Sequence, residues 1–133
     1  MALKRIDHVV VAVKDCKAAG ERYAQLLGKS ASPVQELAAL GIKNTTVNLG
    51  DAFIELAEPL TNQGPVAKFL EAKGEGLYLL SVEVDDMDAT IKDLTAKGVQ
   101  MAGTPVDSGS SKLAFVHPKS THGVLLQLVQ KRR

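Results

Sequence analysis

The sequence predicts an α+β domain built from two copies of one module, each with the order strand, helix, strand, strand. The chain has 133 residues, 45% of them hydrophobic, which suits one compact core better than two independent domains. Apolar runs with strand character are followed by patterns of helical period. An apolar run that ends in Asp15 recurs as a run that ends in Asp86, 86 − 15 = 71 positions later. Self-similarity of this length indicates a duplicated supersecondary unit.

The first module begins with the apolar run Ile6–Val13, which leads into a helical pattern. Asp15 has the residue type that caps helix N-termini, because its carboxylate can accept from a free backbone N–H. Apolar side chains such as Ala19 and Tyr23 then recur at helical spacing until Gly28. A glycine at that point favours a left-handed C-cap. We therefore expect one amphipathic helix here.

A hairpin is expected in the rest of the first module. Strands are predicted at Asn44–Leu49 and Ala52–Glu58, and the Gly-Asp pair at 50–51 suits a tight turn between them. The short apolar stretch Leu37–Leu40 has no clear assignment. After the hairpin, a short helix is predicted at Val66–Lys73, preceded by a Gly-Pro pair and stopped by a glycine.

The second module is expected to repeat this plan. Its predicted elements are a strand at Leu77–Val84, a helix capped by Asp86 and ended by Gly98, and strands near Leu113–His117 and Val124–Val129. The Gly- and Ser-rich segment Ala102–Lys112 is predicted to be a mobile loop. We expect a single domain over residues 1–133, with module one at about 4–60 and module two at about 75–130.

The repeat also predicts where polar chemistry would gather. The two half-sheets can pack about a pseudo-twofold axis with their helices outside and a curved cup inside. His8 is then equivalent to Leu79, and Glu55 to Gln127 at an offset of 127 − 55 = 72. All four side chains are expected to point into the cup. A histidine and a carboxylate from each module would make a divalent-metal site, but here only the first module has both.

Composition excludes several function classes. The chain has 16 basic and 15 acidic residues and a formal net charge of +1, so no strong field attracts nucleic acid or anionic lipid. No apolar run approaches the roughly 18 residues of a membrane span, and no signal peptide is evident. The single cysteine, Cys16, cannot form an internal disulfide, which agrees with a reducing compartment. We expect a cytoplasmic protein with a small-molecule partner and no nucleic-acid or membrane partner.

Several segments together resemble the vicinal oxygen chelate superfamily, also called the glyoxalase/bleomycin-resistance/dioxygenase group, and within it the methylmalonyl-CoA epimerases. The resemblance covers nearly the whole chain. The segments that carry it are Ile6–Val13, Ile54–Leu60, Gly74–Leu77, Glu83–Asp86 and His117–Leu126. It implies a glyoxalase-like fold of two βαβββ modules that form a curved sheet cup.

The resemblance also implies a set of site residues. The family's metal ligands fall on His8, Glu55, Leu79 and Gln127, of which the first two match. The epimerase pattern has two histidines where this chain has Tyr78 and Leu79, and a glutamate where it has Gln127. The implied metal ligands are therefore His8, Glu55 and Gln127, and the implied catalytic residues are Glu55 and Gln127. The implied cofactor is a divalent metal (Co, Ni, Mn, Zn or Mg).

The resemblance also implies a second carboxylate for epimerisation just before Gly41, but this chain has Ala38-Ala39-Leu40 there. Glu36 is the nearest carboxylate and is out of register. An amide at Gln127 cannot take a proton at neutral pH. Both departures remove parts of the acid–base chemistry that an epimerase requires next to a thioester.

Alternatives remain for most of these residues. His8 could be a hydrogen-bonded core histidine, Gln127 could satisfy Glu55 or a polar ligand group, and Leu79 is most simply core. His117 and His122 bracket a turn and are more typical of solvated residues than of ligands. Asp85 and Asp86 resemble a carboxylate pair, although a helix N-cap explains them.

Two functional hypotheses follow. The first is a metal-dependent isomerase or lyase, an epimerase-like protein that holds an ion and an enolate-like oxygen and acts on or binds a small molecule such as an acyl-CoA or a 2-oxo or carboxylic compound. The second is a non-catalytic, metal-free protein that binds a small molecule in the cup. Leu79 and Gln127 favour an atypical epimerase-like protein with a depleted metal site. Because small curved-sheet modules often pair, a homodimer is expected.

Overall fold

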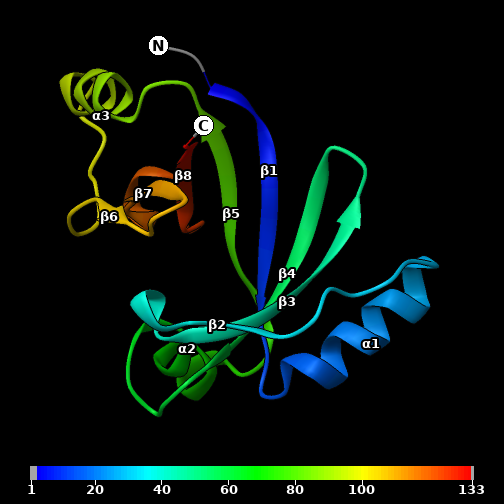
Figure 1. Ribbon diagram of the computed structural model, residues 1–133. Coiled ribbons are helices and arrows are strands. Elements are labelled where there is room, and N and C mark those ends of the chain that lie inside the picture. Colours follow the sequence, from blue (N-terminus) through cyan, green and yellow to red (C-terminus); the bar gives the residue numbers. More distant parts are fainter. Residues whose placement is uncertain (1–2, 133) are drawn as a thin grey trace. The chain divides into compact units, whose positions relative to one another are not determined.

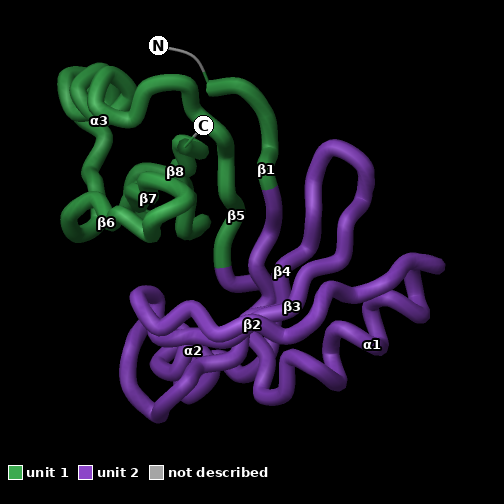
Figure 2. Tube along the Cα trace, viewed as in Figure 1, with its two compact units in different colours: residues 1–7, 79–133 green, residues 8–78 purple. Residues whose placement is uncertain are grey.

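The computed structural model describes residues 3–132, which form helices and strands in the order drawn in Figure 1. The chain divides into two compact units (Figure 2). Unit 2 is the segment His8–Tyr78, and unit 1 contains the chain before His8 and after Tyr78. Strands β1 (Leu3–Ala12) and β5 (Gly76–Val84) each contribute residues to both units. The units are described one at a time.

Unit 2 forms a four-stranded half-sheet in the order β2-β3-β4-β1. Strand β4 pairs parallel with β1, whereas β3 pairs antiparallel with both β4 and β2. The elements of this unit, after β1, are α1 (Cys16–Leu27), β2 (Gln35–Leu37), the 3-10 turn η1 (Ala38–Leu40), β3 (Ile42–Leu49), β4 (Ala52–Pro59) and α2 (Pro65–Lys73). The unit is thus a βαβββ module followed by a short helix.

Helix α1 begins and ends where the sequence predicts. The Asp15 side chain accepts from the Ala18 N–H at 3.1 Å, and Gly28 takes a left-handed conformation with φ of 64°. The helix packs its apolar side against one face of the half-sheet, where Val13, Cys16, Val47 and Leu56 form a buried cluster. Burying this face drives the helix onto the sheet. Residues of opposite phase on β4, such as Glu55, therefore face the other side.

Unit 1 repeats the same pattern. Its strand order is β1-β5-β8-β7-β6, with β8 parallel to β5 and antiparallel to β7. The elements after β5 are α3 (Met87–Ala96), β6 (Val106–Asp107), β7 (Ser111–Val116), the 3-10 turn η2 (Pro118–Ser120) and β8 (Leu126–Lys131). Helix α3 is capped by Asp86, which accepts from the Ala89 N–H at 3.1 Å. A buried cluster that includes Met87 and Leu128 packs this helix on the half-sheet.

The strand registers confirm the internal repeat. In unit 2, Val10 lies opposite Glu55 on neighbouring parallel strands. Adding the sequence offsets gives 10 + 71 = 81 and 55 + 72 = 127, and Ser81 indeed lies opposite Gln127 in unit 1. The α+β class and the two βαβββ modules are therefore confirmed. The boundaries of the modules at 4–60 and 75–130, and their union as one domain, stay predictions.

The structure differs from the sequence prediction in two short strands and one helix end. The unassigned stretch Leu37–Leu40 contains the last residue of β2 and the 3-10 turn η1. Strand β6 lies within the segment 102–112 that was expected to be a loop. Strands β2 and β6 are edge strands of three residues or fewer, too short to give a period. Helix α3 ends with Lys97 as its C-cap, one residue before the expected Gly98.

Candidate functional site

A histidine–carboxylate pair lies almost completely buried in unit 2. His8 Nε2 lies 3.5 Å from Glu55 Oε1, and the two side chains are only 9% and 12% exposed. The ring of Phe53 stacks on the imidazole, with centroids 4.4 Å apart and planes 12° from parallel. An imidazole in this position can exchange a hydrogen bond with a carboxylate on one side and present its flat face to apolar surface on the other.

The parallel pairing of β1 with β4 positions this pair. His8 lies opposite Phe53, and Val10 lies opposite Glu55. Side chains that are opposite each other, or two positions apart on one strand, project from the same face of a sheet. His8, Phe53 and Glu55 therefore share the face that α1 does not cover. The structure therefore brings together two residues singled out in the sequence, His8 and Glu55, and their role as site residues stays a prediction.

The corresponding positions in unit 1 are largely neutral. Leu79 is 5% exposed and belongs to the apolar core, as the simplest interpretation predicted. Gln127 is also buried, and its Oε1 atom has no hydrogen-bond partner among the residues that the structure describes. The neighbouring Ser81, opposite Gln127 in the strand register, is fully buried, and its hydroxyl also has no partner there.

The described residues do not fit the metal centre that the resemblance implies. Within residues 3–132, no group of three or more His, Cys, Asp or Glu side chains is gathered to hold a metal ion. His8 and Glu55 supply one nitrogen and one carboxylate, Leu79 has no donor atom, and Gln127 supplies only an amide. Divalent ions with nitrogen and oxygen ligands usually take more ligands and more negative charge than this pair supplies. The set His8, Glu55 and Gln127 stays a prediction.

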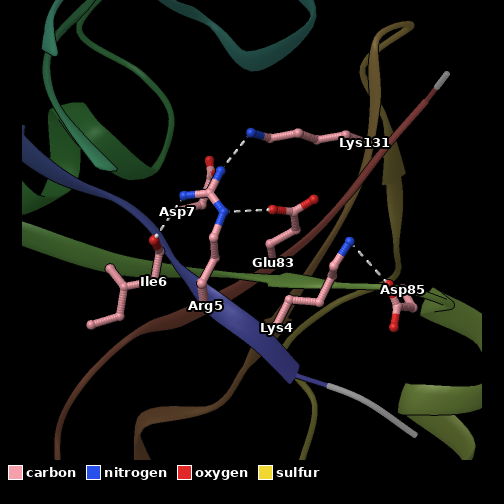
Figure 3. Close-up of polar contacts among 7 residues, drawn as sticks. All are labelled: Lys4, Arg5, Ile6, Asp7, Glu83, Asp85 and Lys131. Carbon is pink, nitrogen blue, oxygen red and sulfur yellow. Dashed lines mark hydrogen bonds and ion pairs between the residues drawn. The ribbon is translucent and has the colours of Figure 1, made fainter. Parts of the chain in front are cut away.

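A charged network in unit 1 was not predicted from the sequence (Figure 3). Its centre is Asp7, whose side chain is 3% exposed; the same carboxylate oxygen lies 2.7 Å from Lys131 Nζ and 3.2 Å from Arg5 Nη2. Arg5 also contacts Glu83 through Nε at 3.0 Å. Lys4 pairs with Asp85 at 3.3 Å. Acidic and basic groups are thus matched within the network.

A cavity of about 610 Å³ lies beside this network. Its lining includes both basic and acidic side chains, among them Lys4, Glu83, Asp85, Lys131 and Arg132. None of the site residues predicted from the sequence lines it. The mixed charge of the walls gives the cavity no strong preference for one sign of ligand.

Three ionisable side chains in the described part of the chain, all outside the candidate site, have shifted pKa values. Burial, together with the neighbouring Glu58 carboxylate, raises the pKa of the Cys16 thiol. Burial raises the pKa of Tyr78, which packs edge-on against Phe69 of α2 at 5.2 Å. The Gly109 N–H, with the Arg132 guanidinium, lowers the pKa of Asp107. A buried thiol with a raised pKa is a poor nucleophile, and Cys16 packs in the buried cluster beneath α1.

The remaining predicted residues have structural contacts. His117 Nδ1 accepts from the Lys119 N–H at 3.0 Å and caps the turn η2. His122 has a φ of 59°, in the left-handed region, within the same connection. Asp86 acts as the cap of α3, as expected. No helix in the part of the chain that the structure describes is long and apolar enough to cross a membrane.

Sequence reasoning missed Phe53 and Ser81. Phe53 is separated from His8 by 53 − 8 = 45 positions, and only the strand register brings the two rings together. Ser81 sits inside an apolar strand and attracts no attention alone. The internal repeat could have drawn attention to Ser81, because this polar residue aligns with the apolar Val10 at the offset of 71.

Comparisons with known proteins agree on a family. The glyoxalase-like domain family matches residues 6–124. The human mitochondrial methylmalonyl-CoA epimerase is 35% identical over 131 residues, which span 96% of this chain and 74% of that protein. The crystal structure of methylmalonyl-CoA epimerase from Mycobacterium tuberculosis matches with a TM-score of 0.90 and 32% identity, covering 98% of this chain and 90% of the other.

A further solved structure contains a ligand. It is a single-residue variant of the Streptomyces coelicolor methylmalonyl-CoA epimerase in complex with 2-nitronate-propionyl-CoA. It matches with a TM-score of 0.89 and 30% identity, covering 98% of this chain and 96% of that chain.

Proposed function

The chain belongs to the glyoxalase-like domain family, and we propose that it binds an acyl-CoA through the His8–Glu55 pair without ordinary metal-dependent epimerase turnover. The observation that carries this proposal is the buried pair itself, which keeps one imidazole and one carboxylate but has no third His, Cys, Asp or Glu beside it among the described residues. In this interpretation the protein is an atypical relative of methylmalonyl-CoA epimerase with a depleted metal site.

The ligand class is supported by similarity to proteins whose names state it. Human methylmalonyl-CoA epimerase and the Streptomyces coelicolor complex with 2-nitronate-propionyl-CoA both match nearly the whole of this chain. A thioester carbonyl accepts hydrogen bonds, and the imidazole of His8 can donate one. Glu55 Oε1, at 3.5 Å from Nε2, can orient the ring.

The loss of turnover is supported by residue chemistry. Moving a proton between the two faces of a carbon requires an acid–base group on each face. Gln127 is an amide that neither gives nor takes a proton at neutral pH, and Ala38-Ala39-Leu40 stands where a second carboxylate was expected. The bound thioester would therefore keep its hydrogen at the carbon between the carboxylate and the carbonyl.

The experiment compares binding with turnover, using methylmalonyl-CoA as the probe. Calorimetric titration should give binding to the wild-type protein that a chelator does not change. His8→Ala and Glu55→Gln should each weaken it by about ten-fold, the ratio that roughly 1.4 kcal/mol produces. Glu58→Gln is the matched control, because Glu58 lies on the same strand but bonds to the Cys16 N–H at 2.9 Å instead. It should leave the affinity unchanged.

Turnover is measured by proton NMR in D₂O, with and without added cobalt, nickel, manganese, zinc or magnesium. The proposal predicts no exchange of the hydrogen between the carboxylate and the thioester. Stoichiometric metal binding that is lost in His8→Ala and Glu55→Gln, together with metal-stimulated exchange, would instead support a metal-dependent isomerase. Failure of the wild-type protein to bind methylmalonyl-CoA would refute the ligand class. Light scattering on the same sample tests the expected homodimer.

A further inference from the structure

We propose that Phe53 is a positioning residue for His8, whose imidazole it holds in one plane so that the ring meets the bound ligand in a fixed direction. This inference deepens the proposed function and rests on it, because it concerns how the His8–Glu55 pair is presented to an acyl-CoA. All three residues belong to unit 2. The Phe53 ring then contributes to ligand affinity in a way that an aliphatic side chain of similar burial would not.

The first support is the stack of the two rings. His8 and Phe53 lie opposite each other on the parallel strands β1 and β4, which are neighbours in the half-sheet (Figure 1). The ring planes are 12° from parallel, and the centroids are 4.4 Å apart. This separation is at the short end of the range over which aromatic pairs attract each other. The contact is thus set by the backbone pairing of unit 2.

An imidazole needs such a neighbour to keep one orientation. The torsion that turns a histidine ring about its bond to Cβ is broad and roughly two-fold, so the backbone does not fix the ring plane. A parallel ring beside it restricts this torsion to two orientations that differ by half a turn. Glu55 distinguishes the two, because only one of them places Nε2 toward its Oε1, which lies 3.5 Å away. Phe53 therefore sets the plane of the imidazole, and Glu55 sets the direction within that plane.

The contact with Glu55 is a weak constraint by itself. Its length of 3.5 Å exceeds the 2.7–3.2 Å of most N–H···O hydrogen bonds, and a long contact tolerates a tilted ring. We therefore expect the imidazole to sample more orientations when the Phe53 ring is removed. A tilted imidazole makes a poorer hydrogen bond to a thioester carbonyl, because hydrogen bonds weaken as they depart from linearity.

The internal repeat provides the second support. Module two has Leu79 in place of His8 and, at the offset of 125 − 53 = 72, Leu125 in place of Phe53. The burial of each position is alike in the two modules: His8 and Leu79 are 7% and 5% exposed, and Phe53 and Leu125 are both half-buried. Burial at position 53 therefore does not demand a ring. The aromatic side chain occurs in the module that has the histidine, and an aliphatic one occurs in the module that does not.

Calorimetric titration with methylmalonyl-CoA tests the effect on affinity. Phe53→Leu introduces the residue type that module two has at the equivalent position, and we expect it to weaken binding about five-fold. Phe53→Tyr keeps the ring and should stay within about two-fold of the wild type. In the double variant of His8→Ala and Phe53→Leu, binding should be no weaker than in His8→Ala alone, because Phe53 acts through the imidazole. Should Phe53→Leu fail to fold, Phe53→Met takes its place, since it also removes the ring.

Proton NMR of the ligand-free protein measures the stack itself. The chain has three histidines, so the ring signals of His8 are identified as those missing from His8→Ala. We expect these signals to lie upfield of the signals of the other two histidines, because protons above the face of an aromatic ring are shielded. At the same pH, they should move downfield in Phe53→Leu and stay upfield in Phe53→Tyr.

The control variant is Phe69→Leu. Phe69 is also half-buried in unit 2 and also contacts an aromatic ring, but its partner is Tyr78, at 5.2 Å. Its loss should leave the affinity and the His8 signals unchanged.

Three results would overturn the inference while the proposed function stands. They are wild-type His8 signals that are not shifted upfield, an affinity of Phe53→Leu equal to that of the wild type, and an affinity of Phe53→Tyr as low as that of Phe53→Leu. A double variant that binds more weakly than His8→Ala alone would also overturn it, by placing Phe53 in direct contact with the ligand. Failure of the wild-type protein to bind methylmalonyl-CoA would overturn both.

Discussion

The contact between α1 and β3 can be tested by adding one methyl group at Gly20. A Cβ built on Gly20 would lie 2.5 Å from Thr45 Cγ2 and 3.4 Å from the Ala31 side chain. The first distance is far inside van der Waals contact. Thr45 cannot readily turn its methyl away, because its hydroxyl donates to the Ser32 carbonyl at 2.5 Å. Gly20→Ala therefore forces either the helix or the strand to move.

Two opposing effects set the magnitude. Alanine in a helix interior is favoured over glycine by about 1 kcal/mol, and overpacking a tight core costs about 1–3 kcal/mol. With Thr45 pinned, the upper part of that range applies, and we expect Gly20→Ala to lower the free energy of unfolding by about 1–2 kcal/mol. Thr45→Ser keeps the hydroxyl and removes the methyl, at a cost of about 1 kcal/mol.

The double variant separates the clash from other causes. In Gly20→Ala with Thr45→Ser, the new methyl occupies the space of the one removed, so stability should return close to that of the wild type. The coupling energy should then be about 2–3 kcal/mol in favour of the pair, at the top of the range for residues in contact. Urea unfolding measures each value, and Gln25→Gly on the exposed side of α1 calibrates the helix term. Additive single effects, or a Gly20→Ala protein as stable as the wild type, would refute the contact.

The other predictions concern charge and pH. Asp7→Asn should lower the free energy of unfolding by about 1–3 kcal/mol, as measured by urea titration. The loss is smaller than for a fully buried pair because the partner, Lys131, is 43% exposed. Asp85→Asn removes a solvated pair and should change the free energy of unfolding by less than about 0.5 kcal/mol in the same titration. Native Cys16 should react with iodoacetamide at pH 8 at least about ten-fold more slowly than in urea, since its pKa is raised. Because the pKa values of Cys16 and Tyr78 are raised in the folded protein, the folded state prefers the protonated side chains. Their contribution to stability is fully present below the ordinary thiol pKa of about 8.5 and is lost as the pH rises through the raised pKa values. A urea midpoint that stays constant or increases when the pH is raised from 8 to 10 would contradict this prediction.

The sequence contained enough information for the fold because its strongest signals are local and repeated. Asp15 and Asp86 cap their helices as expected, since capping depends on residues within one turn. The offset of 71 then ties the two modules together, and the registers opposite Glu55 and Gln127 agree with it. Strands β2 and β6 escaped prediction because two or three residues cannot display alternation.

The candidate site was only half predictable for a different reason. His8 and Glu55 could be assigned to one site because both match the metal-ligand positions of the family that the sequence resembles. The Asp7–Lys131 contact joins residues that are 131 − 7 = 124 positions apart, and the sequence near either residue contains no pattern that predicts it. The stacking of Phe53 on His8 likewise depends on a strand register that composition and period do not encode.

Because the chain contains two copies of one module, each polar residue can be compared with its equivalent in the other copy. The comparison helps to distinguish polar residues that serve the shared fold from those that do not. A polar residue whose equivalent is also polar could serve the common fold. One whose equivalent is apolar is not needed for what the two modules share. Ser81 against Val10 is of this second kind, and so is His8 against Leu79. Each exchange lies on the face of its own half-sheet that the module's helix does not cover, and each changes a strand that begins its module. These two exchanges place differences between the modules on β1 and β5.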